Sequence, residues 1–385
     1  MSMDRVGLTL LLGGLALLPG CAPADSAADV PADPIVKGGT DMNGAYSGAP
    51  LSWWKPHPDS AQGFGYAQVS GVVADSEDRV LIGIRGDIDV ETGAERPNSS
   101  NWIVIANKDG EIVDRWTQWD TMIGFPHQLY ISPYDPERHI WVVDRGSNSQ
   151  NSLKDVHEQI LKFTNDGKQL VMRLRDPNPT QGKGGPVARD NPNPGPFDYG
   201  QASTMTFLPN GDFLVADGYQ NGRIIRYNAA GELVSEFGSV GSGPGQFDLV
   251  HGVAVGPEGR IYTADRNNSR IEVFSADGQF IEEWPNVIDP VGVYVDASEG
   301  VWVVSAGGNR ILKYNTNGQL LTYFGGYGKT TGGFDGGLAR PHQLSVDPQG
   351  NAYVTGYDGP WLNKFMPDPA GDPSRLVGQP YKLPQ

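Results

Sequence analysis

Apolar and polar residues alternate in short runs along most of the chain, and Gly, Pro, Asn and Asp separate these runs. The clearest stretch is VHGVAVGPEGRIYTADRNNSRIEVFSADGQFIEEW, from Val250 to Trp284. A period of two predicts strands, because successive side chains of a strand point to opposite faces. The Pro-Glu-Gly, Asn-Asn and Asp-Gly turns between the runs are short enough to join hairpins. This stretch therefore predicts one antiparallel sheet of four strands.

The same pattern recurs, with further copies beginning near Val69, Pro126, Ala202, Pro290 and Pro341. The third strand shows the period best: QILKF from Gln159, RIIRY from Arg223, RIEVF from Arg270 and RILKY from Arg310. Six units of roughly 35 to 50 residues, each too small to bury its own faces, are typical of a β-propeller. We therefore predict an all-β fold, a six-bladed β-propeller with negligible helix. The units resemble NHL repeats.

The N-terminal segment predicts export. An apolar run from Val6 to Leu18 follows Arg5 and is too short to span a bilayer, as in a signal peptide. Leu18-Pro19-Gly20-Cys21 resembles the bacterial lipobox, which makes Cys21 the lipidation site and 1–20 the signal peptide. We expect a lipid-anchored periplasmic or outer-surface protein. The alternative is cleavage after Ala22-Pro23-Ala24, which would release a soluble secreted protein. Residues 21–50 read as a disordered tether, rich in Ala, Asp, Pro and Gly, and 51–385 as the propeller.

Charge excludes one class of partner. The formal net charge is −16, and no basic run is present to replace counterions on a phosphate backbone, so we expect no nucleic acid. Cys21 is the only cysteine, which leaves no intramolecular disulfide. Two long insertions, 87–101 and 175–201, are either parts of a binding face or solvated loops. We expect a monomer that touches a membrane only through its N-terminal lipid anchor.

Three of the six histidines occupy one register of the repeat. Aligning the first strands places the following residues at equivalent positions: Ser70, His127, Ser203, His251, Val291 and His342. The first strand of each propeller blade lines the central axis, so histidines on alternate blades would surround that axis. Three imidazoles with a fourth position open are typical of a catalytic zinc site, with Zn–N distances of about 2.0–2.1 Å. A single histidine here would instead predict a packed side chain, since each shares strand parity with buried positions such as Leu129, Val253 and Leu344. Packing gives no reason to choose every second blade, which favours Zn²⁺. We take His57, His139 and His157 as surface or loop residues.

These residues resemble the peptidyl-α-hydroxyglycine α-amidating lyase family, zinc propellers that cleave a C-terminal hydroxyglycine to a peptide amide and glyoxylate. SGVVADSEDRVLIGIRGD, from Ser70 to Asp87, is similar to the segment that carries the family's arginine, here Arg85. VADGYQNGRIIRY, from Val215 to Tyr227, is similar to the segment of its catalytic tyrosine, here Tyr219. The resemblance implies a zinc-dependent lyase acting on a small N-acyl or peptidyl α-hydroxyglycine.

The chemistry suits these residue types. The substrate is a carbinolamide, and removing its hydroxyl proton lets the carbon collapse to an aldehyde while the amide nitrogen leaves. A metal ion on that hydroxyl would lower its pKa. A free tyrosine has a pKa near 10, so Tyr219 needs a nearby cation to act as the base. Arg85 could supply that charge or clamp the substrate carboxylate.

The chain departs from the family in several places. Arg340 stands where the family has a methionine, which would bring a second cation near the metal. Gln343 replaces the aspartate that holds a structural Ca²⁺ in the family, and a neutral amide is a weaker ligand for this ion. The backbone carbonyls of Val72 and Leu129 match the other two calcium-ligand positions. The sequence shows neither the family's cysteines nor its copper hydroxylase domain, so we expect the hydroxylated substrate to come from elsewhere. Two other functions stay open: a non-catalytic NHL propeller that binds a protein or glycan, and a lactonase, whose carboxylate and amide ligands differ from three histidines.

Overall fold

The computed structural model describes residues 44–47, 53–55, 60–62, 64–66, 68–89, 91, 102–146, 158–175, 194–326, 338, 340–356 and 361–384. The predicted signal peptide, Cys21, His57, His157 and most of both long insertions lie outside these residues. Within them, no helix is long and apolar enough to cross a membrane.

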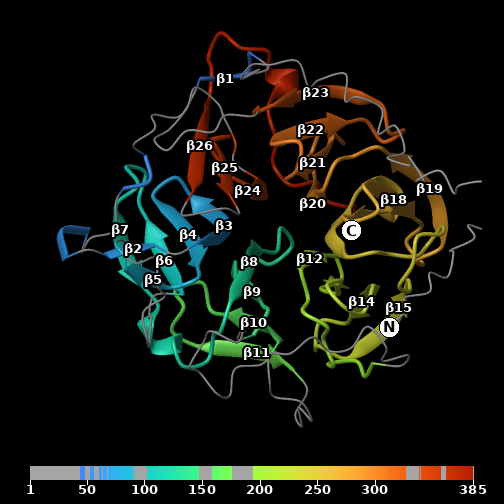
Figure 1. The fold of residues 1–385 in the computed structure, drawn as a ribbon, viewed down its shortest axis with the longest axis horizontal. Helices are drawn as coiled ribbons and strands as arrows, with labels where there is room; N and C mark the ends of the chain where they lie inside the picture. Colours follow the sequence, from blue (N-terminus) through green and yellow to red (C-terminus); the bar gives the residue numbers. More distant parts are fainter. Residues whose placement is uncertain are drawn as a thin grey trace, which may run out of the picture. The chain divides into compact units, whose positions relative to one another are not determined.

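The described residues form six four-stranded antiparallel sheets arranged around a common centre (Figure 1). The sheets are blades 1 to 6, and the first strand of each contacts the first strands of its two neighbours, so the ring closes. Blade 1 consists of β3 (Val69–Ser76), β4 (Arg79–Ile84), β6 (Ile103–Ala106) and β7 (Ile112–Arg115). Blade 2 consists of β8 (Pro126–Ile131), β9 (Ile140–Asp144), β10 (Gln159–Phe163) and β11 (Leu170–Leu174). Blade 3 consists of β12 (Thr204–Phe207), β13 (Phe213–Asp217), β14 (Arg223–Tyr227) and β15 (Leu233–Phe237). Blade 4 consists of β16 (Val250–Val255), β17 (Ile261–Asp265), β18 (Arg270–Phe274) and β19 (Phe280–Pro285). Blade 5 consists of β20 (Pro290–Val295), β21 (Val301–Ser305), β22 (Arg310–Tyr314) and β23 (Leu320–Phe324). Blade 6 is β24 (Pro341–Val346), β25 (Ala352–Gly356), β26 (Leu362–Pro367) and β1 (Tyr46–Ser47).

The prediction of an all-β, six-bladed propeller is confirmed. The third strands expected from the sequence are β10, β14, β18 and β22, with the predicted bounds. A short ribbon of β2 (Phe64–Tyr66) and β5 (Asp87–Asp89) lies outside the blades. The helices of the described residues are single 3₁₀ turns: η1 (Ser60–Gln62), η2 (Thr117–Trp119), η3 (Pro257–Gly259) and η4 (Pro373–Arg375).

The blades are held together by apolar side chains on their facing sides. Each hydrophobic cluster draws buried residues from two neighbouring sheets; one of them joins Val143 of blade 2 to Val215 of blade 3. The repeated Asp-Gly turn contributes to the same packing. Gly278 has a φ of +77°, and a Cβ there would lie 2.5 Å from Phe237 of the preceding blade. Glycine therefore supplies both the left-handed turn and the room for the neighbouring ring.

The N-terminal boundary of the propeller differs from the prediction. Tyr46 and Ser47, expected in the tether, form β1 and pair antiparallel with β26 at the outer edge of blade 6. Ala45 and Tyr46 are buried in the cluster between blades 5 and 6. A strand from the start of the chain thus completes a sheet from its end, which joins the last blade to the beginning of the chain and removes an open edge. No local pattern in residues 44–47 signals this pairing.

The described C-terminal segment lies across the ends of the first strands. The Tyr381 N–H donates to the Val295 carbonyl, Gln379 Nε2 donates to the Asp347 carbonyl, and the Leu383 N–H donates to the Tyr134 hydroxyl. Between this segment and the centre of the ring lies a cavity of about 390 Å³. All three predicted metal ligands lie at the opposite, N-terminal ends of their strands. The loops that precede the first strands and follow the second strands lie at this end, and His342 also lines the cavity.

Candidate metal centre

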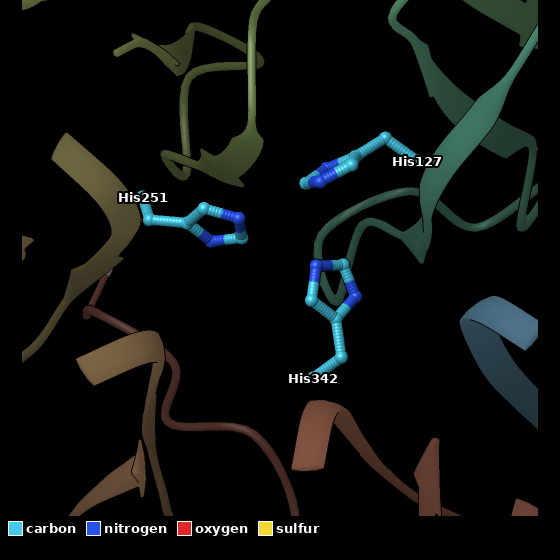
Figure 2. Close-up of side chains that lie close together, drawn as sticks. All are labelled: His127, His251 and His342. Atoms are coloured by element: carbon cyan, nitrogen blue, oxygen red, sulfur yellow. The ribbon is translucent and has the colours of Figure 1, made fainter. Parts of the chain in front are cut away.

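The three histidines expected on the axis do meet there. His127 of β8, His251 of β16 and His342 of β24 extend toward a common point (Figure 2). One ring nitrogen of each lies within 4.8 Å of the others, and all three side chains are buried. This cluster was predicted from register alone, and the geometry brings its members together.

A β-bulge in each of these strands turns the histidine inward. In β8 the pairing with β9 passes from Pro126 to Gln128 and skips His127, and in β16 it skips His251 in the same way. In β24 both His342 and Gln343 fall in the irregular step. A bulge re-aims the extra residue. Leu129, Val253 and Leu344 can therefore pack between blades although their strand parity matches that of the histidines.

Each histidine is oriented by the next blade along the ring. Nδ1 of His127 donates to the Ser203 carbonyl at 2.6 Å, Nδ1 of His251 to the Val291 carbonyl at 2.6 Å, and Nδ1 of His342 to the Ser70 carbonyl at 2.7 Å. The acceptors are the residues at the equivalent register on blades 3, 5 and 1. A carbonyl only accepts, so Nδ1 carries the proton and the neutral ring presents the Nε2 lone pair. Such a bond on the outer nitrogen fixes the tautomer and orientation of a metal-binding histidine.

Burial keeps these rings neutral. The pKa values of His127 and His251 lie well below the usual range, mainly because burial penalises the imidazolium and then because the neighbouring histidines repel its charge. Burial also lowers the pKa of His342, to about 4. Three neutral Nε2 acceptors facing one another have too few donors between them. The donor set therefore fits a divalent cation that prefers nitrogen, such as Zn²⁺.

Tyr219 reaches this centre from blade 3. It follows β13, and its hydroxyl lies 2.9 Å from Nε2 of His251 and 3.3 Å from Nε2 of His127. The preceding Gly218 allows the approach, because a Cβ there would lie 1.7 Å from the Val250 carbonyl oxygen. Asp217 is buried and accepts from Gly200 N and Asn221 Nδ2, which holds the loop. The predicted tyrosine is thus within hydrogen-bond distance of two predicted ligands.

Two arginines lie over Phe125, the ring that contacts His127: Arg85, which was predicted, and Arg145. Arg85 donates to Gln68 Oε1 and lies over the Phe125 ring, 4.5 Å from its centroid. The guanidinium over the Tyr219 ring belongs to Arg145, 3.8 Å from the ring centroid. Sequence reasoning missed Arg145. Its signal was the Asp-Arg pair that ends the second strand in VVDRG and recurs in TADRN, at Asp265 and Arg266.

Arg340 immediately precedes β24, at the same end of the strand as His342, and lies beside an acidic partner. Its Nη2 is 3.5 Å from Asp289 Oδ2, while Arg266 Nε is 2.5 Å from Asp289 Oδ1. One carboxylate thus lies between two guanidinium groups. His139 belongs elsewhere: it lies in the loop before β9, buried, with Nδ1 2.7 Å from Asp135 Oδ2. It was expected in a loop or at the surface, and burial excludes the surface.

The residues at the expected calcium position do not fit that ion. Gln343 is buried, and its Oε1 accepts from the N–H groups of Val72, at 2.9 Å, and Leu129, at 3.3 Å. Its Nε2 donates to the Leu129 carbonyl at 2.7 Å. The Leu129 carbonyl, which matches a calcium-ligand position of the family, here accepts from the Gln343 amide. Calcium was doubtful from the sequence, and this neutral side chain ties blades 1, 2 and 6 together.

Comparison with known proteins agrees with this architecture. Residues 247–274, which span β16 to β18, match the family model of the NHL repeat. NHL repeat-containing protein 3 of Homo sapiens is 26% identical over 243 residues, covering 62% of this chain and 60% of that protein. Peptidyl-alpha-hydroxyglycine alpha-amidating lyase 1 of Drosophila melanogaster is 26% identical over 275 residues, covering 63% of this chain and 44% of that protein. In both cases the match spans less than two thirds of the relative's length.

A solved streptogramin B lyase has the same fold, with a TM-score of 0.50 and 16% identity, over 79% of this chain and 94% of that one. At this identity the likeness concerns the fold alone. The repeat match, the ring of sheets and the distant relatives lead to one conclusion. The chain is a six-bladed β-propeller of the NHL-repeat type, with distant sequence similarity to proteins named peptidyl-α-hydroxyglycine α-amidating lyases.

Proposed function

We propose that the protein is a zinc-dependent lyase that cleaves an N-acyl or peptidyl α-hydroxyglycine to an amide and glyoxylate. The observation that carries this proposal is the convergence of three neutral imidazole Nε2 atoms with the hydroxyl of Tyr219. Distant similarity to proteins named amidating lyases supports it.

His127, His251 and His342 would hold the zinc ion through Nε2, because each Nδ1 already donates to a backbone carbonyl. Three protein ligands leave a position for substrate, and bound Zn²⁺ there would act as a Lewis acid that lowers the pKa of the substrate hydroxyl. The bulged strands and carbonyl partners place the imidazoles before any ligand arrives. Such a rigid set of ligands limits the reorganisation needed for catalysis.

Tyr219 is the group placed to move the proton. Once the imidazole lone pairs are engaged, its hydroxyl no longer has them as acceptors and is available to substrate. The reaction removes one proton from the carbinol oxygen and returns one to the departing amide nitrogen, so a single group that accepts and then donates suffices. The Arg145 guanidinium over its ring would stabilise negative charge that develops on the phenol. A positioned general base of this kind contributes about 10²- to 10⁴-fold to rate.

Metal analysis with a turnover assay tests the proposal. Purified wild-type protein should contain roughly stoichiometric zinc and release glyoxylate from α-hydroxyhippurate. His251→Ala should lose both. His139→Gln is the matched control, since His139 is also buried but lies outside the centre. Wild-type protein that binds no zinc and releases no glyoxylate would favour the alternative, a non-catalytic NHL propeller that binds a protein or glycan.

A further inference from the structure

Arg145 lies in a turn whose backbone is fixed by hydrogen bonds. It follows Asp144, the last residue of β9, whose buried carboxylate accepts from the N–H groups of Gly124, Phe125 and Gly146 at 2.7–3.0 Å. These bonds fix the backbone on both sides of Arg145 and the end of the loop that leads into β8 and His127. The arginine is therefore presented by a rigid turn.

The Arg145 guanidinium contacts two aromatic rings, those of Tyr219 and Phe125. It lies 3.8 Å from the centroid of Tyr219 and 5.2 Å from that of Phe125. Contacts of this kind use the flat faces of the group and leave its in-plane N–H donors for acceptors. Nη2 donates to Gln201 Oε1 at 2.5 Å, a neutral partner. Nε is buried and has no hydrogen-bond partner among the described residues.

Arg145 lies close to the histidines. Its guanidinium is 3.8 Å from the centroid of Tyr219, whose hydroxyl lies 2.9 Å from Nε2 of His251 and 3.3 Å from Nε2 of His127. Glu158 also lies within electrostatic reach of Arg145, but burial raises the pKa of its carboxyl to about 7, so at neutral pH it offsets the arginine only in part. A dication beside this guanidinium would make the centre strongly attractive to anions.

We propose that Arg145 is the residue that selects a carboxylate at this centre, by pairing its in-plane N–H donors with the carboxylate of a small α-hydroxy acid whose hydroxyl lies toward the histidines. The proposal rests on the proposed function for the identity of the substrate, but not for the binding itself. It assigns to Arg145 one of the two roles that the sequence left open for Arg85, which were to supply a charge near Tyr219 or to clamp the substrate carboxylate. Guanidinium and carboxylate pair through parallel N–H···O bonds, a geometry that lysine cannot reproduce.

The test compares two probes of the same size and carbon skeleton, glycolate and its neutral amide, glycolamide, in which an NH₂ donor replaces one carboxylate oxygen. Each is titrated calorimetrically into purified protein of measured zinc content, as wild type, Arg145→Met, Arg145→Lys and Arg85→Met. We expect wild type to prefer glycolate. Arg145→Met should weaken glycolate binding by about 10- to 100-fold, the range for a lost hydrogen bond to a charged group, and leave glycolamide binding nearly unchanged. Arg145→Lys should recover only part of the preference, and it serves as the test if the methionine variant does not fold.

Three outcomes overturn the proposal: wild type that shows no preference for glycolate, a preference that survives in Arg145→Met and Arg145→Lys, and a preference lost in Arg85→Met but kept in both Arg145 variants. Failure of the proposed function has a different signature. If α-hydroxyhippurate yields no glyoxylate but glycolate binding still depends on Arg145, the lyase activity is refuted and carboxylate selection stands.

Discussion

Mild acid should destabilise the metal-free protein through its axial histidines. The pKa values of His127, His251 and His342 are all lowered in the folded protein, chiefly by burial. In the unfolded chain a histidine takes up a proton near its ordinary pKa of about 6.5. As the pH falls below that value, the histidines of the unfolded chain bind protons while those of the folded protein stay neutral. The free energy of unfolding therefore decreases. The stability contributed by the neutral rings is therefore complete above this pH and is lost below it.

The size of the effect can be worked out for His342. Its pKa falls from 6.5 to about 4. This difference corresponds to a loss of about 2 kcal/mol at about pH 5 and about 3 kcal/mol once the pH is below 4. His127 and His251 act in the same direction. Buried carboxyls such as Asp144 and Asp217, whose pKa values are raised by burial, act in the opposite direction, so a pH profile of the wild type alone does not isolate the histidines.

The measurement is urea unfolding with chelator present, followed by tryptophan fluorescence, for wild type and His342→Asn at pH 7.5 and 5.0. The asparagine amide nitrogen can replace Nδ1 as donor to the Ser70 carbonyl, but it does not titrate. Between the two pH values the wild type should lose about 2 kcal/mol more than the variant. Excess zinc at pH 7.5 should stabilise the wild type and have little effect on the variant, because binding to the folded state alone raises its stability.

Equal losses in the two proteins would refute this reasoning. They would mean that His342 is protonated in the folded protein at pH 5, which burial of the ring and the nearby charges of Arg145 and Arg266 oppose.

Three further changes test other parts of the structure. Tyr219→Phe should keep zinc but lower glyoxylate release by about 10²- to 10⁴-fold. The control, Tyr46→Phe, loses a buried hydroxyl far from the centre and should release glyoxylate as fast as the wild type. Equal turnover in the wild type and both variants would exclude Tyr219 as the base. In Gln343→Asp, the melting temperature measured by calorimetry should rise with added Ca²⁺, because a carboxylate would then face the Leu129 carbonyl. The melting temperature of the wild type should not change with Ca²⁺. A rise in the wild type would contradict the hydrogen bond from the Gln343 amide to the Leu129 carbonyl. A chain starting at residue 51 should melt below one starting at residue 44, because it lacks the strand that completes blade 6; identical melting temperatures would show that β1 is dispensable.

The amino-acid sequence by itself determined the strands, the turns and the number of blades. These features follow from a period of two and from Gly, Asn and Asp at the turns, and both are local properties that recur with each repeat. The register of His127, His251 and His342 was readable for the same reason. Six copies of one unit supply an internal alignment, so equivalent positions can be compared within a single chain.

Contacts between distant residues were decided only by the tertiary structure. The bulges that turn the histidines inward depend on pairing with the second strand, and the Nδ1 partner of His342, Ser70, is separated from it by 272 residues. Gln343 likewise meets Val72 and Leu129 across the ring, and Arg145 comes from a different blade than Tyr219. Strand periodicity specifies which face a side chain takes within a sheet. It carries no information about which residue lies opposite once the ring closes, because closure depends on packing between blades.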